Sequence, residues 1–183
     1  LDENDYFMTT STAQAAKVMA WLEELLQTRW TDLKVHVSSV SEQWAGAAVA
    51  GPESRKTLTS CLEDPKIISN ENLPFMGVIS TNLKNGIPCR IARISFSGEM
   101  AYEVYTGSNY ASSMMDILWQ EAKKLNGCLY GLEALGALRI EKGHVTGAEL
   151  DGRVTADDAG LGKMASVKKS YIGSAMHKRG FLS

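Results

Sequence analysis

The spacing of apolar residues predicts an amphipathic helix near the start of the chain. A Ser-x-x-Gln sequence at residues 11–14 is typical of a capping box, in which the hydroxyl and the amide satisfy free backbone N–H groups at a helix start. The apolar stripe that follows has helical spacing and comprises Val18, Leu22, Leu25 and Leu26. We therefore expect a helix from this box to near Trp30.

Three segments rich in β-branched or aromatic residues predict strands, at residues 6–8, 35–40 and 44–50. A short helix is expected after Gly51, because Pro52 suits the first helical position, and it should run to about Leu62. Residues 63–74 have the composition of a loop, and a short apolar segment at 75–79 follows it.

The second half of the chain predicts a strand pair and then two helices. Asn85-Gly86 is a strong turn signal before strands expected at 87–96 and 101–106, which a Ser-Gly-Glu turn would join. Helical spacing then predicts one helix that Gly127 ends, a second at 132–142, and a glycine-rich tail. This order indicates an α+β fold, with antiparallel strands and helices packed on one face.

Composition and charge narrow the class of protein. The chain has 183 residues, of which 44% are hydrophobic, enough for a packed core. Its formal net charge of -2 argues against a nucleic-acid-binding surface, which usually needs an excess of basic residues. The chain starts at Leu1 without a signal peptide or an apolar run of membrane-spanning length, and we expect it to be a segment of something larger.

The cysteines and histidines indicate neither a disulfide framework nor a metal site. The three cysteines, Cys61, Cys89 and Cys128, lie far apart in sequence, and so do the three histidines. The adjacent acids at residues 157–158 are unlike a metal site, because neighbouring side chains in an extended chain point to opposite sides and rarely share an ion. The G-x-G-x-x-A pattern at residues 160–165 resembles a dinucleotide-binding loop, but the stretch before it is polar and acidic where a hydrophobic strand is required, which argues against such a site. We expect a reduced, cytoplasmic protein without a bound metal, and no catalytic nucleophile within this chain.

One acidic residue inside a predicted strand needs an explanation. Glu103 follows Ala101-Tyr102 in a segment that otherwise has core composition, and burying a carboxylate is costly unless a partner satisfies it. The partner is either an arginine or lysine elsewhere in the fold or a ligand with two adjacent N–H donors, such as the pterin edge of a folate. Arg139 and Glu141, two apart near a helix end, do not face each other, and ion pairs with other elements are the favoured explanation for both.

These motifs resemble the aminomethyltransferase (glycine-cleavage T-protein) family, and especially the C-terminal region of alpha subunits in its sarcosine oxidase branch. The broad family motif is Ser-Gly-Glu-x-x-aromatic-Glu, at residues 97–103 here. Stretches similar to the sarcosine oxidase branch comprise residues 7–12, 21–24, 41–55, 138–143 and 154–162. Together they span almost the whole chain in family order.

The resemblance implies a tetrahydrofolate-binding module, part of the T-protein folate-binding fold. The expected folate-binding residues are Glu103, Tyr102, Glu99 and Arg139, with Glu103 holding the pterin ring and no catalytic residue in this chain. Tyr102 points to the opposite face of its strand from Glu103, so its role is assigned to packing. A partial domain is expected over 1–183, as an α+β core at 1–145 and a loop-rich tail at 146–183 that leads to a missing C-terminal barrel.

The resemblance also implies a parent enzyme that oxidises sarcosine to glycine and passes the one-carbon unit to tetrahydrofolate. Flavin (FAD or FMN) and NAD would lie only on other parts of the complex, and the partners would be the other sarcosine oxidase subunits. Alternatives are a glycine-cleavage aminomethyltransferase and a non-catalytic folate-binding or structural module. T-proteins proper carry a ligand-contacting arginine where this chain has Leu135, which argues against the first alternative.

Overall fold

The computed structural model describes residues 3–166 and 168–177. The chain divides into two compact units, Leu1–Tyr130 and Gly131–Ser183, and each is described by itself. In the described residues, no helix has the length and apolar character that a membrane crossing requires.

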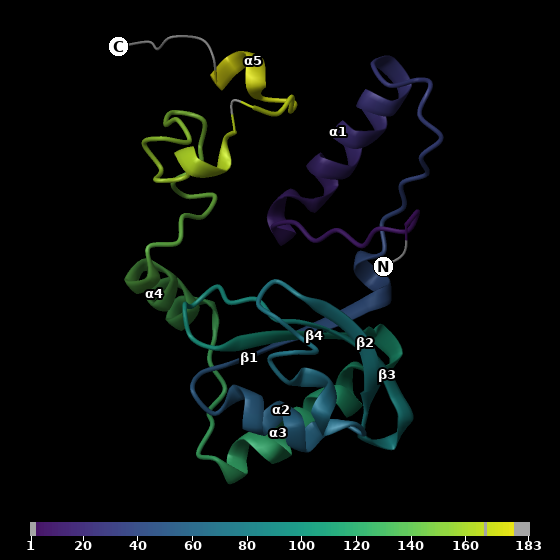
Figure 1. Ribbon diagram of the computed structural model, residues 1–183, viewed down its shortest axis with the longest axis vertical. Coiled ribbons are helices and arrows are strands. Elements are labelled where there is room, and N and C mark those ends of the chain that lie inside the picture. Colours follow the sequence, from purple (N-terminus) through teal and green to yellow (C-terminus); the bar gives the residue numbers. More distant parts are fainter. Residues whose placement is uncertain (1–2, 167, 178–183) are drawn as a thin grey trace. The chain divides into compact units, whose positions relative to one another are not determined.

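An antiparallel sheet forms the centre of the first unit (Figure 1). Its spatial order is β1-β4-β3-β2, and its strands are β1 (Trp44–Ala50), β4 (Ala101–Gly107), β3 (Ile87–Ala92) and β2 (Val78–Leu83). A tight turn joins β2 to β3, with positive φ at Asn85 (67°) and Gly86 (71°). The predicted antiparallel sheet and its Asn-Gly turn are therefore confirmed.

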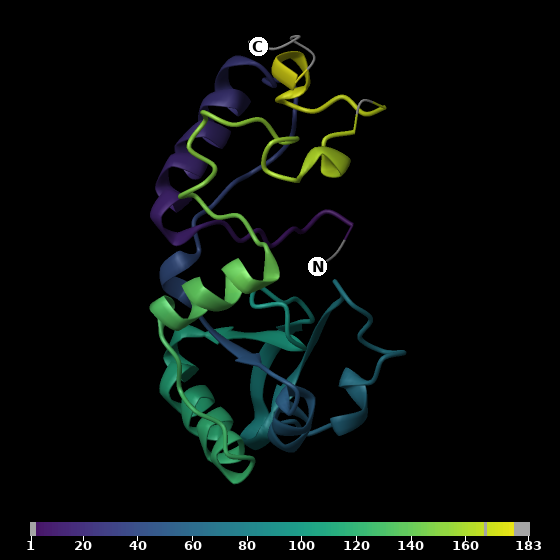
Figure 2. The same cartoon turned by 90° about the vertical axis from the view of Figure 1, so that its left-hand side faces the viewer.

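Two helices cover one face of this sheet, as the fold class predicts (Figure 2). They are α2 (Ser54–Cys61) and α3 (Ala111–Lys124), and we call the face they cover the inner face. The core between helices and sheet includes Leu58, Leu118, Ile91, Tyr102 and Val104. Short 3-10 turns link these elements: η2 (Ser41–Gln43), η3 (Pro65–Ile68), η4 (Lys84–Gly86) and η5 (Ser108–Tyr110).

The first predicted helix is present, but its capping box is not. The α-helix α1 spans Ala15–Thr28 and is preceded by a 3-10 turn, η1, at Thr12–Gln14. The Ser11 side chain makes no capping bond; instead its carbonyl accepts a hydrogen bond from the Gln14 amide at 2.9 Å. The 3-10 turn shifts the start of the α-helix past the box, so the side chains at 11 and 14 no longer stand at its first turn.

Two predicted strands are wrong. Residues 6–8 and 35–40 have no regular secondary structure. The strand order gives β1 a neighbour on one side only, in β4, and neither segment joins the ladder. High β propensity is expressed only where a neighbouring strand supplies hydrogen bonds and side-chain contacts, which explains both errors.

Two other strand boundaries also differ from the prediction. The predicted strand at 87–96 ends at Ala92, and the connection to β4 is an irregular loop at residues 93–100 rather than a three-residue turn. The apolar segment expected at 75–79 is mostly not strand, because β2 begins only at Val78 and continues into the polar residues before Leu83. Cross-strand pairing with β3 decides these limits, and local composition does not.

The second unit begins with α4 (Leu132–Lys142). Gly143 ends this helix with φ of 80°, a left-handed conformation that glycine adopts easily, as the sequence predicts. The regular elements after it are short: a 3-10 turn, η6 (Gly162–Met164), and α5 (Ser174–His177). The expectation of a barrel beyond this tail stays a prediction.

Candidate functional site

The face of the sheet away from α2 and α3, here called the outer face, carries the predicted ligand residue. Side chains alternate along β4, so Glu103 and Tyr105 project from the outer face while their neighbours project into the core. Glu103 lies directly opposite Ala48 on β1 and Ala92 on β3. Two methyl groups thus flank the carboxylate, with Ala48 exposed and Ala92 buried.

Glu103 is partly buried, and its partner is a neighbour on its own strand. The Tyr105 hydroxyl donates a hydrogen bond to Glu103 Oε2. Burial, and after it this bond to the carboxylate, raises the pKa of Tyr105 well above its usual value, so the phenol stays protonated as a donor. The pKa of Tyr130 is also raised, mainly by burial and in smaller part by the charge of Glu103.

The outer face accommodates the Tyr105 ring because the residue opposite it is a glycine. A Cβ at Gly46 would lie 3.0 Å from Tyr105 Cε1, so a larger residue there would push the ring aside. Phe7 meets the same ring at 5.8 Å between centroids, and it also contacts Trp44 at 5.3 Å. These aromatic contacts fix the phenol that holds Glu103.

Tyr102 lies on the inner face and is fully buried, which confirms its predicted packing role. Its hydroxyl accepts a hydrogen bond of 2.8 Å from Arg55 Nε on α2, and Arg55 also donates to Asn70 at 2.6 Å. The structure therefore separates the motif's aromatic residue from Glu103 by the thickness of the sheet.

The structure places the other two expected binding residues in different settings. Glu99 is exposed in the loop at 93–100, next to Gly98, whose φ is 88°. Arg139 belongs to the second unit, where it pairs with Glu149 Oε2 at 2.8 Å and donates to the His144 carbonyl at 3.1 Å. The Thr146 amide and then Arg139 lower the pKa of Glu149 to about 2. The ion pair predicted for Arg139 is thus present within its own unit.

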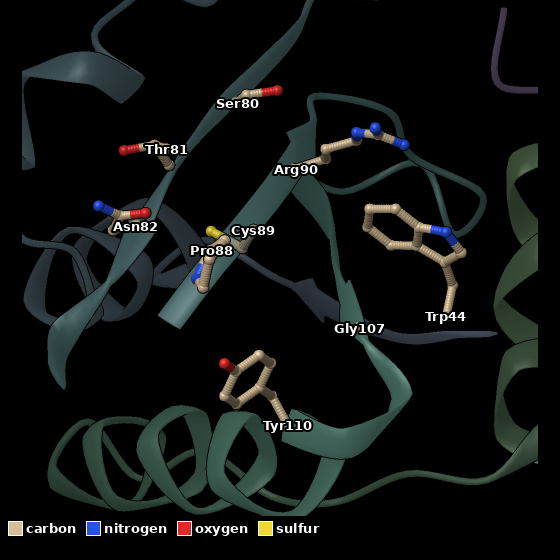
Figure 3. A pocket seen from close by; sticks show the side chains of 9 residues that line it. All are labelled: Trp44, Ser80, Thr81, Asn82, Pro88, Cys89, Arg90, Gly107 and Tyr110. Carbon is tan, nitrogen blue, oxygen red and sulfur yellow. The ribbon is translucent and has the colours of Figure 1, made fainter. Parts of the chain in front are cut away.

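A hollow of about 640 Å³ adjoins this region, at the end of the sheet where β3 begins and β4 ends (Figure 3). Its lining does not include Glu103. It comprises Trp44, Ser80, Thr81, Asn82, Pro88, Cys89, Arg90, Gly107 and Tyr110.

Sequence reasoning did not single out Arg90 or Tyr105. A two-residue repeat from Glu103 along the strand would have found Tyr105, whereas Arg90 becomes its neighbour only through the pairing of β3 with β4.

The two buried cysteines show no nucleophilic activation. Burial raises the pKa of the Cys61 thiol to about 12 and that of Cys89 to about 11, so both remain protonated and inert near neutral pH. Within residues 3–166 and 168–177, no group of three or more potential His, Cys, Asp or Glu ligands gathers around a metal position.

Comparison with known proteins shows one family over most of the chain. Residues 1–169 match the GCVT N-terminal domain. The chain is 42% identical over 181 residues to the sarcosine oxidase subunit alpha of Rhizobium meliloti and 38% identical over 180 residues to that of Corynebacterium sp. strain U-96. Each alignment covers 98% of this chain but only 18% of the relative. It is also 28% identical to an aminomethyltransferase of Halothermothrix orenii, over 94% of this chain and 46% of that protein.

Proposed function

The chain belongs to the GCVT N-terminal domain family, and from this membership we propose that it is the tetrahydrofolate-binding part of a sarcosine oxidase alpha subunit. The chain spans about a fifth of the alpha subunits it matches. Flavin and NAD sites would lie on the rest of the parent protein or on its partner subunits. The parent enzyme would oxidise sarcosine to glycine and transfer the one-carbon unit to tetrahydrofolate.

The observation that carries this proposal is the setting of Glu103. A carboxylate on the outer face, flanked by Ala48 and Ala92 and held by the Tyr105 hydroxyl, suits a planar ring with two adjacent N–H donors. Such a ring could lie flat beside it and donate two parallel, charge-assisted hydrogen bonds. The two carboxylate oxygens therefore match the pair of N–H donors on a pterin edge.

The residues of this chain would bind and orient the ligand. Glu103 would hold the pterin ring, and the Tyr105 hydroxyl would fix the rotamer of the carboxylate before binding. Tetrahydrofolate, when bound, supplies the amine that captures the one-carbon unit. The role of the chain is thus positioning, which lowers the entropic part of the barrier without acid–base chemistry here.

A second candidate function is that of an aminomethyltransferase, supported by the match to the Halothermothrix orenii protein. It is the weaker proposal. The lower identity and Leu135, which stands where T-proteins carry an arginine, both favour the oxidase branch. Leu135 is half-buried on α4.

The test is Glu103→Gln in the full-length enzyme. Loss of a hydrogen bond to a charged group should weaken tetrahydrofolate binding by about 1.5–3 kcal/mol, measured by calorimetry under anaerobic conditions. Sarcosine oxidation should continue, with free formaldehyde released. Glu71→Gln, at an exposed carboxylate in the loop before β2, is the matched control and should leave affinity unchanged. Unaltered affinity in Glu103→Gln would remove Glu103 from the site.

A further inference from the structure

The hollow beside the outer face has a single charged residue in its lining. Of the nine lining residues, Arg90 is the only cation, and none is an acid (Figure 3). Its volume is about 640 Å³, and it is widely open to solvent. The nearby carboxylate of Glu63 is already engaged by Asn82 Nδ2 at 3.2 Å and the Gly86 amide at 2.9 Å. An uncompensated positive charge in a hollow favours an anionic ligand.

The guanidinium of Arg90 is held in place without an acidic partner. Its Cζ lies 4.3 Å from the centre of the Trp44 ring and 5.2 Å from that of Phe7. None of the ion pairs in the described part of the chain involves Arg90. Aromatic rings contact the faces of a guanidinium and leave its N–H groups, which lie in the plane, available to donate to a bidentate acceptor such as a carboxylate.

Further polar groups surround this cation. Ser80 lies directly opposite Arg90 on β2, and cross-strand neighbours of this kind have Cβ atoms about 4.5–5.5 Å apart. The Tyr110 ring lines the hollow from η5, below the strands in Figure 3. One planar cation with a hydroxyl beside it matches one carboxylate, whereas a phosphate site usually gathers several donors and charges.

We infer that this hollow is a carboxylate-binding subsite, which takes the glutamyl end of a folate whose pterin ring lies at Glu103. The inference rests on the proposed function. Arg90 pairs with Tyr105, two residues from Glu103 along β4, and the hollow continues to Gly107, four residues from Glu103 or about 13 Å at roughly 3.3 Å per residue. That separation lets an elongated ligand place its ring at one end of the strand and its carboxylates at the other.

The experiment compares two ligands, tetrahydrofolate and a tetrahydropterin that lacks the p-aminobenzoylglutamate tail. Affinities are measured by calorimetry for the full-length protein and its Arg90→Gln variant. Arg90→Gln should weaken tetrahydrofolate binding about ten- to a hundredfold, the equivalent of one charged hydrogen bond, and leave tetrahydropterin binding unchanged. A role limited to packing Phe7 and Trp44 would not distinguish the two ligands, so equal effects on both would overturn the inference.

Two further variants separate specific recognition of a carboxylate by the Arg90 guanidinium from a general effect of positive charge. Arg90→Lys retains the charge but not the planar fork, and it should recover only part of the lost affinity. Lys84→Gln removes an exposed cation from the same hairpin, outside the lining, and should bind both ligands like the wild type. A loss in Lys84→Gln equal to that in Arg90→Gln would show long-range attraction in place of a subsite.

Other outcomes identify the source of the carboxylate and the point of failure. Sarcosine is titrated as a third ligand. If Arg90→Gln weakens sarcosine binding and leaves tetrahydrofolate binding unchanged, the subsite binds the carboxylate of the amine substrate, and its assignment to folate is wrong. Wild-type binding of tetrahydrofolate with no loss in Arg90→Gln overturns the subsite alone. A wild-type protein that binds neither pterin overturns the proposed function, and the inference with it.

Discussion

The two faces of the sheet are built from the same strands and differ in what their residues do. On the inner face, Tyr102, Val104 and Thr106 of β4 are fully buried under α2 and α3. On the outer face, Glu103 and Tyr105 of the same strand present a carboxylate and a phenol, and Arg90 of the neighbouring β3 presents a guanidinium. One strand thus supplies core packing and a binding surface by alternation, and a change at one position should affect one property and spare the other.

The pair Tyr102 and Tyr105 shows the difference most clearly. Both are tyrosines of β4 with hydrogen-bonded hydroxyl groups, but one accepts a bond from Arg55 in the core and the other donates to Glu103 outside it. Residue type and strand are the same, so the face on which each side chain lies, and the partner it meets there, decides whether the hydroxyl serves stability or the site.

The largest expected effect comes from opening a cavity on the inner face. Ile91 is fully buried on β3, so Ile91→Ala should lower the free energy of unfolding by about 2–5 kcal/mol, measured by urea denaturation. Ser80→Ala on the exposed outer face is the matched control and should change stability by less than about 0.5 kcal/mol. Similar losses in both variants would mean that the outer face is part of the core.

Tyr102→Phe should have the next largest effect. The change removes the acceptor of the 2.8 Å bond from Arg55 Nε and leaves a charged donor without it, at a cost of about 1.5–3 kcal/mol in unfolding free energy. Tetrahydrofolate affinity should not change, because Tyr102 lies across the sheet from Glu103. An affinity loss without a stability loss would contradict the assignment of the two faces.

Alkaline pH should weaken the inner face through its buried thiols. Burial raises the pKa of Cys89 from 9.0 to about 11, so between these values the unfolded chain releases a proton that the folded chain keeps. Stability is therefore complete below pH 9 and decreases as the pH rises, by at most about 1.4 kcal/mol per pH unit for each thiol.

Urea midpoints at pH 8, 9.5 and 10.5 measure this slope. Cys128→Ala, at the exposed cysteine, is the control and should keep the wild-type slope, whereas Cys89→Ala should flatten it. A stability that does not depend on pH in this range would show that the thiols ionise equally in both states.

The smallest expected effect is on the outer face. Tyr105→Phe removes the donor to Glu103 and should weaken tetrahydrofolate binding by about 0.5–1.5 kcal/mol, the usual net value of one hydrogen bond. Ligand titration of the full-length enzyme measures the affinity, and urea denaturation should show a smaller change than in Tyr102→Phe. The reverse ranking of the two tyrosines would refute the comparison from which this prediction comes.

Local sequence predicted those elements whose signals are themselves local. The turn at Asn85-Gly86 and the end of α4 at Gly143 need only backbone conformations that their residues favour, so the sequence located both. The strand at residues 44–50 was also predicted, and it formed because β4 pairs along its whole length. The segment at 35–40 has similar propensity but no pairing strand, and it stayed irregular.

The sequence by itself determined the α+β class, the family motif and the choice of Glu103, because these depend on residue type and spacing along the chain. Only the tertiary structure decided that Gly46 makes room for the Tyr105 phenol and that Arg90 lies against the rings of both Phe7 and Trp44. These contacts join segments distant in sequence, and strand register creates them. Register follows from the hydrogen bonding and packing of the whole sheet, which no local pattern specifies.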